Sequence, residues 1–483
     1  MNTTNHEQFD NKRPITSQII AICFIKFSAS IAFAVIFSGL SLYLTQKEMQ
    51  SSASATLITG LFLSLNYFLP FIGGTIANRL ISSKKLYCLG TGLSFIGCLM
   101  LAYGNNFYLG LSLFLVSSLV GNVCLKTMVT DLFHADQVKE RRTAFVWSYV
   151  GMNAGFLIGC FISGYGSNHN SFTSLFVIMG FFIALSVALT LIFMKDNHDI
   201  KYQKSNLSPS MVALGILILV VVAVNFLLKF AQLSESYIAW LAVGGMLSFL
   251  WYGYCQINNN ERVNYLKFIG YSSLTILFWS LYMLTPIAFM QLIEHAVDRN
   301  FFNIILAPQW FINADSITIL LVAPIFALLI NKGRSINTRP MSNLSYFAFA
   351  FLFCSMALLV LFYGFSEVSN LKMSAWPMLG CLVLLAIGET FIAPIGDSLI
   401  GELLPVSLRA TMTAYWGMNI GIGVLLATVI ANLFIMPYLN ENGFIGQNLI
   451  MLQQNILIFC AILFMLTLVI FICNRYRYSG SNN

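Results

Sequence analysis

The chain has 483 residues, of which 58% are hydrophobic and only 9% are charged. Soluble domains carry about 25% charged residues, so a chain of this composition cannot coat a large globular surface with polar groups. Disorder is excluded as well, because it requires low hydrophobicity and high charge. The composition therefore predicts an all-α polytopic membrane protein.

Apolar stretches of about 20 residues, each long enough to cross a bilayer, recur along the chain between short polar connectors. Residues 1–16 are polar and lead into a long apolar run with no cleavage-site pattern, which predicts a cytoplasmic tail and a first membrane helix. The predicted spans are 17–44, 54–78, 85–103, 107–133, 142–166, 171–194, 208–230, 236–255, 264–292, 312–331, 342–365, 374–400, 407–436 and 450–474.

Fourteen spans predict two six-helix bundles plus an extra pair. The bundles are expected at 17–194 and 264–474, with an inserted helical hairpin at 208–255 that packs on their outside. Residues 475–483 are expected to form a second cytoplasmic tail, since an even number of spans places both termini on one side. No connector is long enough for a soluble domain.

The basic residues test this topology, because cytoplasmic loops of membrane proteins are enriched in Lys and Arg. With a cytoplasmic N-terminus, the inner connectors and tails carry 19 of the 25 Lys and Arg, the outer connectors carry four, and Lys26 and Lys126 lie within helices. This asymmetry explains the net charge of +7. It indicates a multi-pass protein of the inner or plasma membrane and argues against a nucleic-acid partner.

The sequence contains no pattern that indicates a metal site, a cofactor site or an enzyme active site. The ten Cys lie mostly in apolar runs without metal-ligand spacing, and the five His lie in or beside polar connectors. We find no nucleophile–base motif for catalysis. The sequence therefore predicts neither an enzyme nor a resident metal or cofactor.

Four ionisable residues fall inside apolar spans, namely Lys26, Lys126, Asp315 and Glu389. Charges in membrane helices are costly, so each one is a candidate for function. Two bases and two acids could instead pair and lock helices together, and Lys26 and Asp315 could lie near an interface and be solvated. The functional alternative is a polar cavity between the bundles, where Lys126 and Glu389 face a substrate that carries both charge signs.

Several motifs occur in a defined order along the helices. They are Asn66–Pro70 followed by Ile72-Gly73-Gly74; Gly74 to Asn78 and Lys84; Gly121-Asn122 with Lys126; Phe145 through Gly155; Pro308–Pro324 around Asp315; Ile387-Gly388-Glu389; and Trp416. Together they resemble the proton-dependent oligopeptide transporter family, a branch of the major facilitator superfamily. The resemblance implies the major facilitator fold, with two six-helix bundles and an inserted central pair.

The resemblance also implies roles for individual residues. Lys126 would contact a peptide carboxylate and Glu389 a peptide amino terminus. Asp315 would attract the same ammonium group. Asn153, Tyr67 and Tyr149 would supply neutral hydrogen bonds, and Trp416 an apolar wall. Proton-coupled transport of di- and tripeptides by alternating access is the implied activity, and this architecture can work as a monomer.

The first helix departs from the family, whose E-x-x-E-R motif falls here on Lys26, Ala29 and Ser30. A family Asn is replaced by Asp315. Lys26 could substitute for the missing Arg at the substrate, or could form a fixed bridge with an acid. If protons are coupled, Glu389 and Asp315 are the candidate carriers, and Glu389 is favoured. The alternative activity is transport of another small molecule by the same fold, such as a modified peptide, amino-acid derivative, siderophore-like compound or exported metabolite, with altered or absent proton coupling.

Overall fold

The computed structural model describes residues 15–104, 106–133, 137–194, 208–301, 303–335, 342–368, 372–440, 443–444 and 449–479. The predicted tails are covered only where helices reach into them, and residues 1–14 and 480–483 lie outside the described residues. Lys195, Lys201, Lys204 and Arg339, which contribute to the predicted charge asymmetry, also lie outside them.

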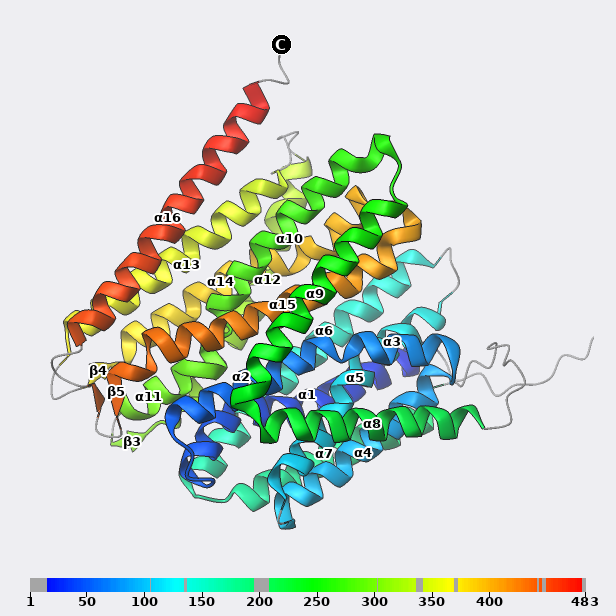
Figure 1. The fold of residues 1–483 in the computed structure, drawn as a ribbon, viewed down its shortest axis with the longest axis horizontal. Helices are drawn as coiled ribbons and strands as arrows, with labels where there is room; N and C mark the ends of the chain where they lie inside the picture. Colours follow the sequence, from blue (N-terminus) through cyan, green and yellow to red (C-terminus); the bar gives the residue numbers. More distant parts are fainter. Residues whose placement is uncertain are drawn as a thin grey trace, which may run out of the picture.

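Helices make up nearly all of the described chain (Figure 1). The first half contains α1 (Ile15–Gln46), α2 (Ser52–Phe68), α3 (Pro70–Arg79), α4 (Ser83–Tyr103), α5 (Phe107–Asp131), α6 (Val138–Asn168) and α7 (Phe172–Phe193). The middle of the chain forms α8 (Pro209–Lys229), α9 (Ala231–Gln256) and the short 3₁₀ helix η1 (Asn259–Glu261). The second half contains α10 (Arg262–Tyr282), η2 (Thr285–Phe289), α11 (Met290–Ala296), α12 (Pro308–Ser335), α13 (Asn343–Ser366), α14 (Ala375–Leu403), α15 (Val406–Phe434), η3 (Met436–Tyr438) and α16 (Leu449–Ser479).

Short strands gather at one end of the molecule, beside α11 (Figure 1). They are β1 (Val297–Asp298), β2 (Asn300–Phe301), β3 (Ile304–Ile305), β4 (Met373–Ser374), β5 (Leu439–Asn440) and β6 (Gly443–Phe444). β1 pairs in parallel with β4, and the antiparallel pairs are β2 with β3 and β5 with β6. The β1–β4 pair ties together connectors that lie far apart in the sequence, whereas the other two pairs are local hairpins.

Thirteen helical segments of the described chain are long and apolar enough to cross a membrane. Each stretch closes its backbone hydrogen bonds internally, which a segment without access to water requires. The predicted span at 312–331 lies within α12, a further helix of 28 residues.

Two predicted spans are interrupted at prolines. The span at 54–78 divides at Pro70 into α2 and α3, and the span at 264–292 passes through the π-helical turn η2, which contains Pro286. Proline has no backbone N–H and clashes with the preceding turn, so a regular α-helix cannot continue through it undisturbed. The joined segments at both places are still long and apolar enough to cross a membrane.

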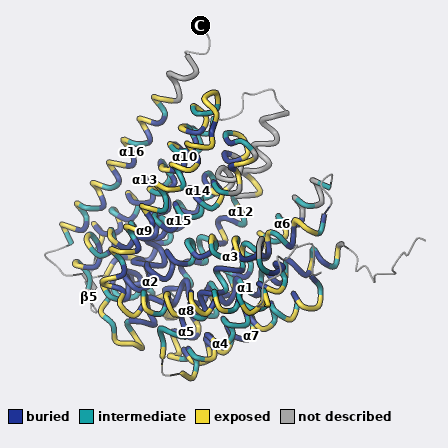
Figure 2. Tube along the Cα trace, turned by 45° about the vertical axis from the view of Figure 1, so that its right-hand side comes forward, coloured by how far each residue is buried: buried dark blue, intermediate teal, exposed yellow. Residues whose placement is uncertain are grey.

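The helices form two groups that enclose a buried core (Figure 2). In the first group α1 packs against α6 and α7, and α4 packs against α5; in the second, α13 packs against α14 and α16. α8 packs against α5, whereas α9 packs against α15 and α2, so the middle pair contacts both groups from the periphery.

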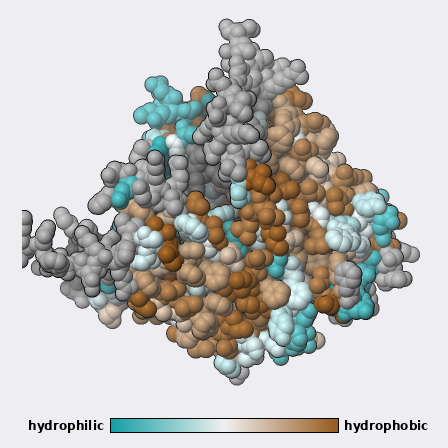
Figure 3. Space-filling model, turned by 180° about the vertical axis from the view of Figure 1, so that it is seen from behind, coloured by the Kyte–Doolittle hydropathy of each residue, from teal (hydrophilic) through white to brown (hydrophobic). Residues whose placement is uncertain are grey.

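The outer surface is apolar. Large hydrophobic side chains such as Leu219, Trp240 and Leu241 are exposed on α8 and α9. Figure 3 shows hydrophobic residues over much of the face seen from behind. Exposed apolar area of this extent is unstable in water and fits a lipid environment.

Close packing of α1 on α6 depends on three glycines spaced four residues apart on one face of α6. A Cβ added to Gly151, Gly155 or Gly159 would overlap α1, at the carbonyl oxygens of Cys23, Phe27 and Ile31 respectively. Small residues let membrane helices approach to backbone contact, and α1 carries part of the candidate site described below.

We expect Gly155→Ala to lower the thermal unfolding midpoint of the purified protein. Overpacking a tight contact costs about 1–3 kcal/mol, more than the about 0.5–1 kcal/mol that alanine contributes to a helix. Gly92→Ala in α4 is the matched control, because nothing lies within 4 Å of its added Cβ. Equal midpoints for the two variants would contradict this account of the α1–α6 contact.

Candidate functional site

A cavity of about 310 Å³ lies between the two halves of the molecule. The first half contributes residues of α1, α2, α4, α5, α6 and α7, and the second half contributes residues of α10, α12 and α14. Its polar lining is unusual for helices this apolar. The polar side chains are Lys26, Ser30, Asn66, Tyr67, Tyr87, Thr91, Ser117, Ser118, Asn122, Tyr149, Asn153, Trp279, Tyr282, Asp315, Ser316 and Glu389.

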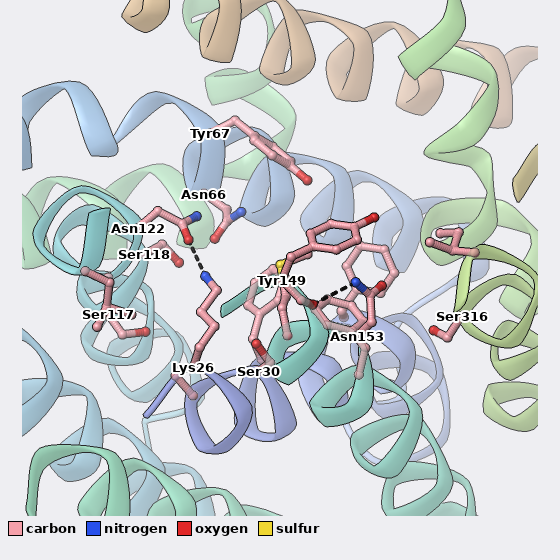
Figure 4. A pocket seen from close by; sticks show the side chains of 18 of the residues that line it. Lys26, Ser30, Asn66, Tyr67, Ser117, Ser118, Asn122, Tyr149, Asn153 and Ser316 are labelled. Atoms are coloured by element: carbon pink, nitrogen blue, oxygen red, sulfur yellow. Dashed lines mark hydrogen bonds between the residues drawn. The ribbon is translucent and has the colours of Figure 1, made fainter. Parts of the chain in front are cut away.

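The positive charge of the lining comes from the first half. The ammonium group of Lys26 on α1 donates a hydrogen bond to Asn122 Oδ1 on α5 (Figure 4). Lys126 lies one turn beyond Asn122 and is not part of the cavity lining, although it interacts electrostatically with Lys26. Two cations therefore lie on this side of the site, and Lys26 is the one that faces the cavity.

The negative charges come from the second half. Asp315 on α12 and Glu389 on α14 both line the cavity. Between them, Tyr282 of α10 donates its hydroxyl to Asp315 Oδ2 at 3.0 Å and also interacts with Glu389. Glu389 Oε2 is buried and has no hydrogen-bond partner. An unpaired buried oxygen is energetically costly, which makes this atom a place for a proton or a ligand donor.

The four intramembrane charges are not paired with one another. Among the described residues, the ion pair found is Arg299–Glu294 at 3.2 Å, near α11 and outside the cavity. Neither Asp315 nor Glu389 forms an ion pair with Lys26 or Lys126 within the described part of the chain. The arrangement is one of separated poles, with the cations on one half and the acids on the other.

Neutral groups occupy the space between the poles. Asn153 is only 6% exposed and donates from Nδ2 to the carbonyl oxygen of Tyr149 at 2.9 Å (Figure 4). An apolar wall stands beside it, where the rings of Phe33, Phe37 and Phe156 pack with centroid separations of 5.5–5.9 Å. The cavity thus combines charge, neutral hydrogen bonding and an apolar surface.

Six of the eight residues predicted for the site line this cavity: Lys26, Tyr67, Tyr149, Asn153, Asp315 and Glu389. Lys126 and Trp416 do not. The ring of Trp416 lies near that of Phe268, at a centroid separation of 6.1 Å. Sequence reasoning missed Tyr282, which stands in no recognised motif, and used Asn122 only as part of a motif.

Hydrogen bonds join the two halves at the end of the molecule that holds α11. Gln291, which is fully buried, donates to the carbonyl and hydroxyl oxygens of Ser41 at 2.9 Å and to Thr45 Oγ1 at 3.2 Å. Trp310 Nε1 donates to the carbonyl oxygen of Phe161 at 3.0 Å. These bonds hold α1 and α6 to the second half on this side of the cavity.

Comparison with known proteins gives a consistent assignment. The family model described as the POT family matches residues 84–445. Dipeptide and tripeptide permease A of Serratia proteamaculans (strain 568) is 23% identical over 413 residues, covering 82% of this chain and 79% of the permease. The permease of the same name from Salmonella typhimurium (strain LT2) is 23% identical over 416 residues, covering 82% and 80%.

Solved structures agree on the fold. A POT family transporter in complex with 5-aminolevulinic acid superposes with a TM-score of 0.81 at 18% identity, covering 94% of this chain and 95% of that one. The peptide transporter POT in complex with sulfate gives 0.81 at 15% identity, covering 95% and 94%. The chain has the major facilitator fold of these transporters and belongs to the POT family.

Proposed function

We propose that this protein is a secondary active transporter that moves di- and tripeptides, coupled to protons, by alternating access. The observation that carries the proposal is the division of charge in the cavity, with an ammonium on the first half and two carboxyls on the second. A zwitterionic peptide carries the complementary charges at its two ends. It can therefore bridge the two halves, which no monopolar ligand can do.

The substrate would lie with its carboxylate toward Lys26 and its ammonium toward Asp315 and Glu389. Tyr67, Tyr149 and Asn153 would hydrogen-bond the backbone of the peptide. The cavity volume of about 310 Å³ lies at the small end of the range for ligand sites, about 300–1,000 Å³, and suits a short peptide. Relatives named dipeptide and tripeptide permease favour peptides over the other small molecules that the rewritten first helix left open.

Alternating access requires the two halves to separate at one end while they meet at the other. The bonds of Gln291 to Ser41 and Thr45 would then be the contacts that break when the opposite side closes. We place the protein in the inner or plasma membrane with both termini cytoplasmic, because the basic residues concentrate on that side of the predicted topology. The bundles at 17–194 and 264–474 would move relative to each other, and the hairpin at 208–255 would pack on their outside. One copy of the chain would suffice for transport.

Uptake of labelled di- and tripeptides into liposomes tests the proposed activity. We expect uptake above that of empty liposomes, and we expect an inward proton gradient to raise it. Folded protein that shows neither exchange nor uptake of peptides would overturn the proposal and would turn attention to other small zwitterions.

The position of Lys26 predicts that Lys26→Gln weakens binding of dipeptides much more than Lys126→Gln does. A hydrogen bond to a charged group contributes about 1.5–3 kcal/mol, which corresponds to about a 10- to 100-fold rise in KM. A C-terminally amidated dipeptide, which lacks the carboxylate, should bind wild type and Lys26→Gln alike. A larger effect of Lys126→Gln would assign carboxylate recognition to Lys126 instead.

The buried amide of Gln291 predicts a role in closing the α11 end. Gln291→Leu removes the bonds to Ser41 and Thr45 that join the two halves, so we expect this end to open. Spin labels at Met49 and Ile304, which are exposed on opposite halves, would report a longer mean distance in a background where the exposed Cys255 and Cys473 are replaced by Ser. Gln453→Leu is the control, because Gln453 donates to Phe365 within the second half. An unchanged distance in the Gln291 variant would contradict the assignment.

A further inference from the structure

We propose that Asp315 and Glu389 form a single proton site that holds one exchangeable proton between them, and that Tyr282 is the positioning residue that keeps the two carboxyls together. The inference rests on the proposed proton-coupled function and deepens it. It differs from assigning the proton to Glu389 alone, because it makes both acids necessary for coupling.

The geometry places the three groups in one cluster. The acids lie on α12 and α14, which pack against each other, and both face the cavity. Tyr282 reaches them from α10, with its hydroxyl 3.0 Å from Asp315 Oδ2 and near enough to Glu389 to interact with it. The two carboxyls also act on each other electrostatically.

A tyrosine hydroxyl has one proton to donate, and here it is given to Asp315. Glu389 Oε2 is buried without a partner, so the cluster lacks one donor. Two carboxylates that share a site of low dielectric constant cannot both remain ionised at low cost. One added proton removes the repulsion and supplies the missing donor, which is how carboxyl pairs elsewhere come to share a proton.

The charges of the residues that line the cavity also indicate one proton. One ammonium, Lys26, faces two carboxyls, Asp315 and Glu389, which leaves one excess negative charge when both acids are ionised. A zwitterionic peptide is neutral and does not compensate for it. One proton on the carboxyl pair does, so the charges that line the cavity balance when it holds one peptide and one proton.

Titratable groups that interact with the pair include Tyr282 on α10, Tyr149 and Cys160 on α6, and Tyr67 on α2. Lys26 on α1 faces the pair across the cavity, and Lys126 lies behind Lys26. Since neither lysine forms an ion pair with the acids in the described part of the chain, the proton remains the partner available to them. It would pass between a carboxyl oxygen and water on whichever side the cavity opens.

Isosteric variants test the shared site in liposomes. Asp315→Asn and Glu389→Gln each mimic the pair with its proton fixed in place. We expect both to retain peptide exchange between the two sides of the membrane and both to lose accumulation driven by a proton gradient. The double variant Asp315→Asn, Glu389→Gln removes the anionic pole and should lose exchange as well. Gradient-driven accumulation that survives in either single variant would overturn the proposal, because the proton would then belong to one acid.

Tyr282→Phe tests the positioning role. We expect exchange at saturating peptide to persist while the pH profile of gradient-driven uptake shifts, since the two carboxyls lose the group that holds them together. Tyr271→Phe is the matched control, because Tyr271 lies on the same helix, is stacked on Phe347 and does not line the cavity. Identical pH profiles for wild type and Tyr282→Phe would remove Tyr282 from the mechanism.

An infrared titration separates failure of this inference from failure of the proposed function. The wild-type protein without peptide should show a carboxylic-acid band that disappears in each single variant at the same pH, because the remaining acid then ionises without a charged neighbour. A band that persists in one single variant would place the proton on one acid. The wild-type protein could show a carboxylic-acid band that both single variants lose and yet exchange no peptide. That result would refute the peptide assignment and would still support the shared proton site.

Discussion

Burying an ionised side chain among membrane helices costs about 2.5–3.5 kcal/mol on insertion scales, and this cost organises the whole molecule. With 9% charged residues, the chain keeps most charge at helix ends and in connectors. Lys26, Asp315 and Glu389 are exceptions, and all three face one cavity. The surrounding helices enclose these charges in a cavity of about 310 Å³ between the two halves.

The two halves are chemically unequal around this cavity, and that inequality gives the architecture its use. The first half contributes the ammonium group of Lys26, which donates a hydrogen bond to Asn122. The second half contributes the carboxyl groups of Asp315 and Glu389, and Tyr282 donates a hydrogen bond to Asp315. A ligand with opposite charges at its ends is therefore attracted to both halves at once. Polar bonds from Gln291 already join the halves on one side, so binding energy in the cavity can be transferred to contacts that open and close. The glycine face of α6 keeps α1 close enough for Lys26 to take part.

Sequence patterns predicted the fold class well, because long apolar stretches and the distribution of Lys and Arg follow directly from the bilayer. Details that depend on tertiary packing were less predictable. Pro70 and Pro286 divide helices that hydropathy alone joins. The parallel pairing of β1 with β4 brings together segments that no local pattern relates.

In the candidate site, too, some features follow from sequence patterns and others depend on tertiary packing. Ionisable residues in apolar runs pointed to Lys26, Asp315 and Glu389, since their cost is visible in the sequence. Which face of a helix meets the cavity is not visible when the helix is apolar all round. Asn122 therefore takes the cavity position that Lys126 was expected to hold, and Trp416 packs toward Phe268. Tyr282 was missed because a tyrosine in an apolar helix ordinarily indicates packing.

We propose that the opposite charges of the two halves orient one zwitterion across the cavity. A structure of the protein with a bound dipeptide would show this orientation. We expect the peptide carboxylate at Lys26 and the peptide ammonium between Asp315 and Glu389. A peptide bound in the reverse direction, or one that contacts only one half of the molecule, would contradict it.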